Sequence, residues 1–305
     1  MRSKVLLIGS AGFIGQHLVQ ELTDVYELWE IDIPSFLNST GKPGIGIDLL
    51  SGEASRLVRD NLRGNQFKAV IYLTNITTKT VPTGMDVEDA NLLAVTNLLK
   101  GLDVHSEKFG LFSSVYVYKN PDTLQAITEN SPIFPTSPYG RLKWGMENLT
   151  TTWGKEKGIP VNIFRPEWAY GPGDKTRKLI PELCRAAAST DVYSVKINPR
   201  ETRQPIFVSD LVRGIKKWIS LDQVHENEVF LMVGPTPITQ QNMLQIARDN
   251  ARLSQNPVVE FLDPDASFLN YSFDNIRTQK RLDWKAEISC TKGMQTLINY
   301  LDHPG

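Results

Sequence analysis

The stretch VLLIGSAGFIGQHLVQELT, residues 5–23, decides the fold that we expect for this chain. An apolar run typical of a strand leads into three glycines, Gly9, Gly12 and Gly15, and a segment with helical spacing of apolar residues follows directly. A glycine turn between a strand and a helix lets backbone N–H groups approach an anion such as a pyrophosphate. The pattern therefore predicts a dinucleotide-binding turn at the start of an α/β fold.

Asp32 ends the second apolar run, YELWEID at 26–32. An acid about 20 residues beyond such a loop can bind both hydroxyls of an adenosine ribose, and it repels a 2′-phosphate. No Arg or Lys stands beside Asp32, so the sequence favours NAD over NADP as the cofactor. The alternative is a glycine turn that serves packing only.

Short apolar runs and helical patterns alternate as far as about residue 165, with further runs at 69–74, 109–115 and 160–165. This alternation indicates a parallel sheet covered by helices. Beyond it the pieces are shorter: a helix near 178–189, a strand near 192–195, and helices near 210–220 and 239–251. We expect a Rossmann-type doubly wound parallel sheet as the NAD-binding domain, residues 1–165. A smaller C-terminal α/β substrate-binding region, residues 166–305, would be partly interleaved with the main sheet.

The amino-acid composition of the chain argues against nucleic acids, membranes and metal ions as partners. The 305 residues are 41% apolar and 22% charged, and the net charge of −1 lacks the basic footprint that nucleic acids require. No apolar run approaches the ~20 residues of a membrane span. Cys184 and Cys290 match no metal-ligand or redox spacing, which is typical of reduced thiols in the cytosol. We therefore expect a cytoplasmic protein with no nucleic-acid or membrane partner and no metal site.

Tyr139 and Lys143 stand four residues apart in SPYGRLKW, residues 137–144. Positions i and i+4 share one face of a helix, and Pro138 suits a helix start. A phenol with a pKa of about 10 is a poor base at neutral pH, but a lysine ammonium and a cationic nicotinamide would lower that pKa. Ser113 and Ser114, at the end of a predicted strand, could supply a hydroxyl partner. Alternatively, the two serines only cap the strand end.

Several motifs in one order resemble the extended short-chain dehydrogenase/reductase family, which includes NAD-dependent nucleotide-sugar epimerases and dehydratases. GSAGFIG (9–15) is similar to the family's GxxGxxG loop, and YGRLK (139–143) to its YxxxK. The other similar segments are NLLAVTNLL (91–99), FSSVYVY (112–118), RPEWAYGPGD (165–174), RQPIFVSDLV (203–212) and DNIRTQKRLDWKA (274–286). The resemblance covers nearly the whole chain and implies the same fold and an NAD cofactor.

The resemblance also implies roles for individual residues. Tyr139 would exchange the proton of a sugar hydroxyl, Ser114 would hydrogen-bond the same oxygen, and Lys143 would hold the nicotinamide ribose; these three are the catalytic candidates. The cofactor-binding candidates are Gly9, Gly12, Phe13, Ile14, Gly15, Asp32, Asp48, Leu49, Leu73, Thr74, Asn91, Ser113, Tyr139, Lys143 and Pro166. The substrate-binding candidates are Asn75, Ser114, Trp168 and Arg203.

The sequence departs from the family at two informative places. Family dehydratases usually place an Asp-Glu pair directly after the catalytic hydroxyl, where this chain has Val115 and Tyr116. Without those proton carriers, 4,6-dehydration is disfavoured. Trp168 replaces an asparagine that commonly contacts the substrate's diphosphate, whereas Arg203 stands where the family uses an arginine on that anion. A surface ion pair is the alternative role for Arg203.

We therefore expect an NAD-dependent nucleotide-sugar epimerase that resembles UDP-glucose/galactose 4-epimerases. The alternatives are an NAD(P)H-dependent keto-sugar reductase or dehydrogenase, a 4,6-dehydratase, and a non-catalytic NAD-binding protein. Helices expected from about residues 86 and 139 often pair across a twofold axis in the family. They carry enough apolar surface here for either self-association or packing within the chain, and we predict a homodimer.

Overall fold

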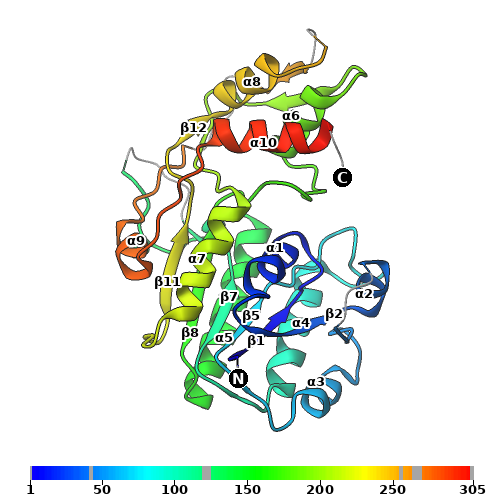
Figure 1. Cartoon of the computed structure of the whole chain (residues 1–305), viewed down its shortest axis with the longest axis vertical. Coiled ribbons are helices and arrows are strands. Elements are labelled where there is room, and N and C mark those ends of the chain that lie inside the picture. Colours follow the sequence, from blue (N-terminus) through cyan, green and yellow to red (C-terminus); the bar gives the residue numbers. More distant parts are fainter. Residues whose placement is uncertain (1, 41–43, 119–124, 254–256, 263–269, 303–305) are drawn as a thin grey trace. The chain divides into compact units, whose positions relative to one another are not determined.

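The computed structural model describes residues 2–40, 44–118, 125–253, 257–262 and 270–302 (Figure 1). The chain forms two compact units. Unit 1 comprises residues 1–119, 132–165 and 215–230, and unit 2 comprises residues 120–131, 166–214 and 231–305. The chain therefore passes between the units more than once, and each unit is described by itself.

The core of unit 1 is a seven-stranded sheet in the order β11-β8-β7-β5-β1-β2-β3. Its strands are β1 (Lys4–Ile8), β2 (Glu27–Asp32), β3 (Ile45–Gly46), β5 (Ala69–Tyr72), β7 (Phe109–Phe112), β8 (Val161–Pro166) and β11 (Glu228–Met232). The five pairings among β1, β2, β3, β5, β7 and β8 are all parallel. From β1 the chain winds outward first to β2 and β3 and then to β5, β7 and β8. The Rossmann-type doubly wound sheet is confirmed.

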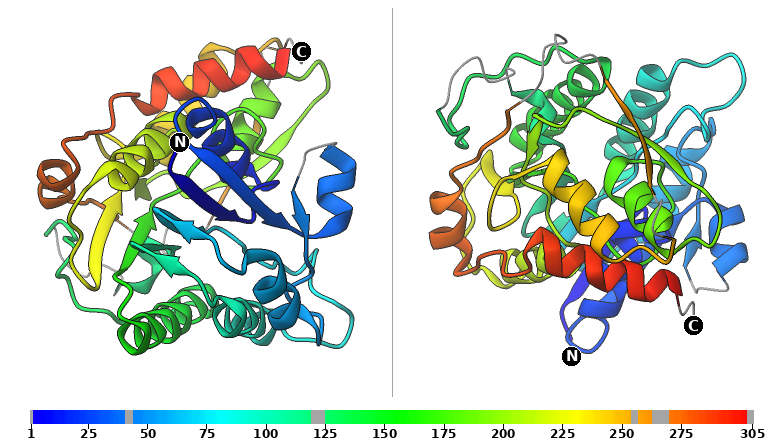
Figure 2. Two further views of the ribbon diagram at one scale, coloured as in Figure 1. Left: turned by 60° about the horizontal axis from the view of Figure 1, so that its bottom comes forward. Right: turned by 90° about the horizontal axis from the view of Figure 1, so that it is seen from above.

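Helices cover both faces of this sheet (Figure 2). The helices of unit 1 are α1 (Phe13–Leu22), α2 (Pro34–Thr40), α3 (Ala54–Leu62), α4 (Val87–Gly101), the 3₁₀ turn η1 (Val115–Val117) and α5 (Pro138–Lys157). Two short strands outside the main sheet, β4 (Gln66–Phe67) and β6 (His105–Ser106), pair with each other. Helices α3, α4 and α5 lie on one face of the sheet, and α1 lies on the other. The strands between them are buried on both sides, as their continuous apolar runs predict.

Helix α5 has strong local signals at both ends. Ser137 caps its start by accepting a hydrogen bond of 3.0 Å from the N–H of Gly140, and Pro138 occupies the first turn. Gly158 ends the helix in the left-handed conformation, with φ of 67°. These signals explain why its start was predicted to within one residue.

Two strands of the sheet end earlier than the sequence predicts. Strand β5 stops at Tyr72 and β7 at Phe112, whereas the apolar runs continue to 74 and 115. The residues beyond them turn at the carboxyl edge of the sheet: the N–H of Leu73 still bonds to Ile8 O, and Ser114 caps η1. The short strand β3 and the strand β11 were not predicted, because neither shows a distinctive spacing of apolar residues.

Unit 2 is built around three helices, α6 (Leu179–Ala188), α8 (Gln240–Asp249) and α10 (Cys290–Asp302), which pack together (Figure 1). Its strands form two pairs: β9 (Ser194–Ile197) pairs with β13 (Val258–Phe261), and β10 (Thr202–Arg203) pairs with β12 (Ile238–Thr239). Helix α9 (Ile276–Leu282) precedes α10 in the chain. Helix α7 (Val208–Ser220) begins in unit 2 and ends in unit 1. Cys184 and Cys290 are buried free thiols in the core of this unit. Among the described helices, none combines the length and the hydropathy that crossing a bilayer requires.

Candidate active site

The glycine loop joins β1 to α1 at the point where the winding direction of the sheet reverses. Gly9 has a φ of +90°, and a Cβ there would lie 3.0 Å from the backbone nitrogen of Thr74. A Cβ at Gly15 would lie 2.4 Å from the carbonyl oxygen of Gly9. Glycine at these two positions therefore lets the loop lie close both to the segment that follows β5 and to the first turn of α1.

The start of α1 is suited to an anion. Gly12 precedes the helix, and no side chain caps its first N–H groups. The hydroxyl of Ser10, in the same loop, is fully buried and has no hydrogen-bond partner among the described residues. Exposed N–H groups, the helix dipole and a buried polar atom without a partner together fit the pyrophosphate of a dinucleotide.

Asp32 binds the glycine loop directly. Its Oδ2 accepts a hydrogen bond of 2.8 Å from the N–H of Ala11, and its Oδ1 accepts one of 2.8 Å from Ile33. Burial raises the pKa of Asp32 above its usual value, while these two hydrogen bonds act in the opposite direction. A carboxylate offers about four lone-pair sites. Two of them therefore remain for the hydroxyls of a ribose.

Two asparagines of α4 fix loops at the carboxyl edge. Asn91 is fully buried, and its amide bonds to both the N–H and the carbonyl of Ile76, at 2.9 and 2.8 Å. It therefore positions the segment that carries Leu73, Thr74 and the exposed Asn75. Asn97 donates to the carbonyl of Leu49, at 2.9 Å.

The remaining cofactor candidates differ in what their side chains do. Asp48 is exposed and accepts a hydrogen bond from the N–H of Leu50 at 2.9 Å, whereas Leu49 is buried. Phe13, Ile14 and Pro166 are half-buried. The side chain of Asn91 thus holds the backbone of Ile76, and that of Leu49 packs in the core of unit 1; their cofactor contacts stay predictions.

Tyr139 and Lys143 lie on one face of α5, next to the end of β7. Tyr139 hydrogen-bonds Ser114, and its side chain remains 42% exposed. The ammonium of Lys143 is buried, donates to the carbonyl of Phe112 at 3.2 Å, and lies 5.7 Å from the centre of the Tyr139 ring. The structure therefore brings the three predicted catalytic side chains together.

The pKa of Tyr139 differs from the expectation. Burial around the hydroxyl raises the pKa of Tyr139 to about 12; the hydrogen bond with Ser114 acts against this, and Tyr116 adds to it. In the chain by itself the pKa of Tyr139 is therefore raised, and not lowered as we expected from Lys143 and a cationic nicotinamide together. A further positive charge near the phenol is thus needed before it can serve as a base at neutral pH.

A buried charge network lies behind this trio. Glu147 follows Lys143 by one turn of α5, and its carboxylate binds Arg165 through two hydrogen bonds of 3.0 and 2.6 Å. The hydroxyl of Ser113 donates to the same carboxylate, and Arg165 donates to the hydroxyl of Tyr118 at 2.7 Å. All of these side chains are buried. Ser113, a cofactor candidate, thus uses its hydroxyl to hold α5 against the end of β7.

Glu147 and Arg165 were not predicted from the sequence as site residues. A signal for Glu147 was present, because residues 139, 143 and 147 repeat at four-residue spacing and so share one helix face. The partner of a buried Glu on such a face is set by the fold and has no sequence signal of its own.

Arg203 lies in a second cluster, within unit 2. Its Nε donates to Glu201 Oε1 at 2.8 Å, and its Nη2 contacts the same oxygen. The guanidinium carbon lies 4.4 Å from the ring centre of Trp168 and 4.6 Å from that of Tyr271. Arg203 is only 4% exposed, so its ion pair is buried and the surface alternative is wrong.

Glu167 is the unexpected member of this cluster. It is fully buried, one of its oxygens lies 3.6 Å from Nη1 of Arg203, and neither oxygen accepts a hydrogen bond from the described residues. Burial raises the pKa of Glu167 to about 7, although the charges of Arg203 and Lys178 act to lower it. Neither Glu167 nor Glu201 was predicted from the sequence as a site residue.

Comparisons with known proteins agree with this geometry. The model of the "NAD dependent epimerase/dehydratase family" matches residues 5–232. A UDP-glucose 4-epimerase of Lactobacillus helveticus is 30% identical over 227 residues, which are 69% of this chain and 68% of that protein. A dTDP-D-glucose 4,6-dehydratase of Dictyostelium discoideum is 26% identical over 68% of this chain.

Other matches show how much of its relatives' length this chain covers and which solved structures share its fold. The chain spans about half the length of some relatives: 54% of the Dictyostelium dehydratase and 46% of a trifunctional Arabidopsis thaliana enzyme. The crystal structure of a UDP-glucuronic acid 4-epimerase from Bacillus cereus, in complex with UDP-glucuronic acid and NAD, covers 99% of this chain and 100% of its own. Its TM-score is 0.82 and its sequence identity 21%. A likeness at this identity shows the fold.

Proposed function

Because this chain belongs to the NAD dependent epimerase/dehydratase family, we propose that it is an NAD-dependent nucleotide-sugar epimerase. It would resemble the UDP-glucose/galactose 4-epimerases and act by transient oxidation of a sugar hydroxyl. The observation that carries the proposal is Tyr139, hydrogen-bonded to Ser114 and close to Lys143, at the carboxyl edge of a Rossmann sheet. The relatives named as epimerases support the same choice.

NAD fits the residues at this edge. We propose that the loop of Gly9, Gly12 and Gly15 holds its pyrophosphate and that Asp32 holds its adenosine ribose. When bound, NAD supplies the acceptor and donor of the hydride that leaves and returns to the sugar carbon. Lys143, already directed at the end of β7, would bind the nicotinamide ribose.

Tyr139 is the residue that we propose to move the proton. Its phenolate takes the proton of the sugar hydroxyl as that carbon is oxidised, and it gives the proton back when the keto group is reduced. The N–H of Tyr116 donates to the oxygen of Ser114 at 3.3 Å. When substrate binds, the Ser114 hydroxyl would donate its proton to the substrate oxygen in place of its hydrogen bond with Tyr139. The ammonium of Lys143 favours the phenolate electrostatically.

Substrate contacts remain part of the proposal. Trp168 and Arg203 would meet the diphosphate of the nucleotide sugar, the arginine through its fork of N–H groups. Asn75, exposed beyond β5, would face the sugar. The sugar and the nucleotide are the finer parts of the proposal, for which the named relatives suggest UDP-glucose as the first compound to try.

Dehydration is less well supported. Several relatives are 4,6-dehydratases, yet this chain has no carboxylate directly after Ser114. Val115 is buried there, and the ring of Tyr116 lies edge-on to that of Tyr139 at 6.0 Å. Elimination of water needs an acid and a base that these two side chains cannot supply. A reductase or dehydrogenase that releases its cofactor uses the same trio and stays the main alternative.

One experiment separates these functions. The purified protein is denatured gently, any released nucleotide is identified by mass and absorbance, and nucleotide sugars are screened by NMR for interconversion without added cofactor. We expect stoichiometric NAD and interconversion. An empty protein that consumes NADH or NADPH with a keto-sugar is a reductase, and no activity in either assay supports a non-catalytic NAD-binding protein.

Replacing Asp32 with Ser will weaken NAD binding by about tenfold or more, because a hydrogen bond to a charged acceptor is worth roughly 1.5–3 kcal/mol. NADP binding will change less, because its 2′-phosphate is repelled by the carboxylate that the substitution removes. Titration of both cofactors by protein fluorescence measures the two affinities. An unchanged ratio of the affinities would show that another residue discriminates between the cofactors.

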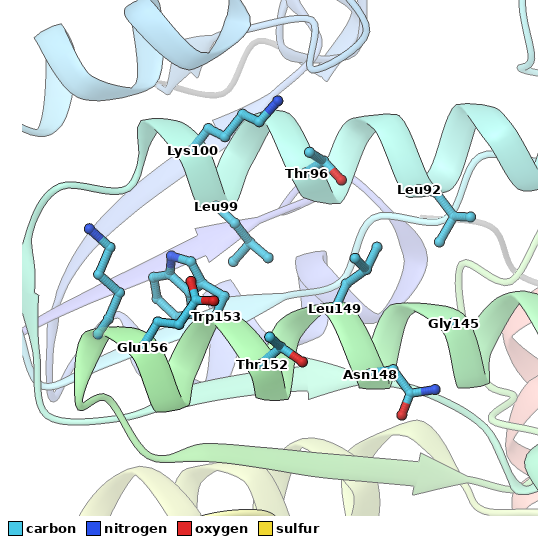
Figure 3. Close-up of a pocket in the computed structure, with 11 residues that line it drawn as sticks. Leu92, Thr96, Leu99, Lys100, Gly145, Asn148, Leu149, Thr152, Trp153 and Glu156 are labelled. Atoms are coloured by element: carbon cyan, nitrogen blue, oxygen red, sulfur yellow. The ribbon is translucent and has the colours of Figure 1, made fainter.

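We propose that the protein is a homodimer built on α4 and α5. A groove of about 730 Å³ runs between these helices (Figure 3). Leu92, Leu99 and Leu149 point into it, and Leu149 is 41% exposed. A second copy that presents the same two helices would bury this apolar surface.

Leu149→Asp will convert the dimer into a monomer, because it places a charge in the apolar centre of that groove. Light scattering at micromolar concentration should give twice the chain mass of 34.3 kDa for the wild type and the single mass for the variant. The control is Lys100→Ala, at the polar margin of the groove, which should leave the dimer intact. A monomeric wild type contradicts this prediction.

We propose the cytosol as the compartment of the enzyme. Cys184 and Cys290 are both buried free thiols, as expected in a reducing environment.

A further inference from the structure

The side chain of Arg203 is buried among two aromatic rings and two carboxylates. The rings of Trp168 and Tyr271 both pack against its guanidinium, Glu201 contacts the edge formed by Nε and Nη2, and Glu167 lies beside Nη1. The two glutamates differ in exposure, because the side chain of Glu201 is 15% exposed and that of Glu167 is fully buried. An anion can therefore reach the arginine most easily along the edge that Glu201 occupies.

The charges around Arg203 oppose an anionic ligand. The guanidinium of Arg203 stands against two carboxylates, so these three groups together are negative when both glutamates are ionised, and Lys178 adds a positive charge that acts on Glu167. A guanidinium edge binds a carboxylate and a phosphate with the same geometry. Glu201 thus occupies the position that a phosphate oxygen of a substrate would take, and the buried Glu167 adds a repulsion that cannot move into solvent.

We propose that an anionic group of the substrate binds Arg203 by displacing the carboxylate of Glu201, and that Glu167 takes up a proton when this happens. The inference rests on the proposed function in one respect: the anion would be the diphosphate of a nucleotide sugar. Glu201 competes for the arginine, whereas Glu167 makes the binding depend on pH.

The displacement is physically accessible. Glu201 and Arg203 are two residues apart, and the outer side of the Glu201 side chain meets solvent, so the carboxylate can rotate into water. An ion pair that exchanges one anion for another keeps the buried guanidinium paired throughout. The two aromatic rings packed against the guanidinium hold it in place while the exchange occurs.

The proton uptake follows from the surroundings of Glu167. Arg203 and Lys178 favour its charged form, while burial and Glu201 disfavour it; the thiol of Cys290 is also within electrostatic reach. A diphosphate carries more negative charge than the carboxylate that it replaces. It therefore raises the pKa of Glu167 further, from a starting value of about 7. The affinity for the anion is then greatest below that pKa and falls as the pH rises through it.

The first test is calorimetric titration of the NAD-loaded protein with UDP-glucose from about pH 6 to about pH 8. The diphosphate of UDP-glucose has no titrating proton in this range. For the wild type we expect the affinity to fall by up to about tenfold per pH unit, with net proton uptake on binding. Glu167→Gln should bind at every pH as tightly as the wild type does at low pH.

Glu201→Gln is the matched control, because it removes the other carboxylate from the same arginine. It should bind UDP-glucose more tightly than the wild type at every pH and keep a fall of affinity with rising pH, which begins at lower pH because Glu201 helps to raise the pKa of Glu167. Equal slopes in the wild type and Glu167→Gln, or no gain in affinity in Glu201→Gln, would overturn the inference.

A second measurement separates this inference from the proposed function. Infrared difference spectra of the protein should show the carbonyl band of a protonated carboxylic acid that disappears near neutral pH, is absent in Glu167→Gln and persists in Glu201→Gln. Sulfate and UDP-glucose should each move this titration to higher pH. If only sulfate does so, the nucleotide-sugar assignment is wrong and the inference holds. If neither does, or if the band does not titrate, the inference is wrong.

Discussion

Tyr139→Phe will lower turnover by at least about 10²-fold, the usual cost of losing a general acid/base. NAD should stay bound, because the substitution removes one hydroxyl and leaves the glycine loop and Asp32 unchanged. The measurement is the rate of interconversion of the nucleotide sugar that the NMR screen identifies, together with the NAD content of the purified variant.

The pH dependence gives this prediction a second readout. Burial raises the pKa of Tyr139 to about 12 in the chain by itself, so only a small fraction is phenolate at neutral pH unless added positive charge lowers that pKa. Turnover of the wild type should therefore rise with pH through the pKa of Tyr139 in the loaded enzyme, and this rise should be missing in the variant. Tyr116→Phe is the control, because its ring neighbours Tyr139 without a proposed proton role. Near-normal turnover of Tyr139→Phe would exclude the mechanism.

Glu147→Ala will lower the free energy of unfolding by about 3–5 kcal/mol, which is the cost of leaving one partner of a buried ion pair uncompensated. Arg165 loses both of its hydrogen bonds to Glu147, and Ser113 loses its acceptor. Activity should fall as well, because Glu147 and Lys143 together hold α5 against the end of β7, where Ser114 lies. Urea unfolding followed by circular dichroism measures the change in stability.

Glu147→Gln is the matched control for this prediction. It keeps the size of the side chain and its acceptor oxygen but removes the negative charge beside Arg165. A loss of stability of similar size in both variants shows that the charge is what matters. A clearly smaller loss in the glutamine variant assigns part of the effect to the hydrogen bonds and packing that it keeps. If Glu147→Ala unfolds at the urea concentration of the wild type, the network is not a stabilising element.

Much of the fold and part of the site follow from local patterns. The glycine spacing after an apolar run, and the alternation of such runs with helical periods, depend on backbone sterics and on one face of each element being buried. The doubly wound parallel sheet that these patterns predict is the sheet that forms. Tyr139 and Lys143 could be placed on one helix face for the same reason, because that relation involves a single helix and no tertiary contact.

The sequence by itself therefore determined the class of fold, the family, and the positions of the glycine loop, Asp32 and the Tyr139–Lys143 pair. Only the tertiary structure decided which side chains are buried and which groups they meet there. In that structure Arg165 binds Glu147, and the amide of Asn91 bonds to the backbone of Ile76. Arg203 packs against two aromatic rings, and Glu167 lies beside it. These partners are set by how separate segments pack, and desolvation, which controls the pKa of Glu167 and Tyr139, depends on the density of all neighbouring atoms. Neither the contact partners of a side chain nor its desolvation produces a repeating pattern in the sequence, so neither could be predicted from it.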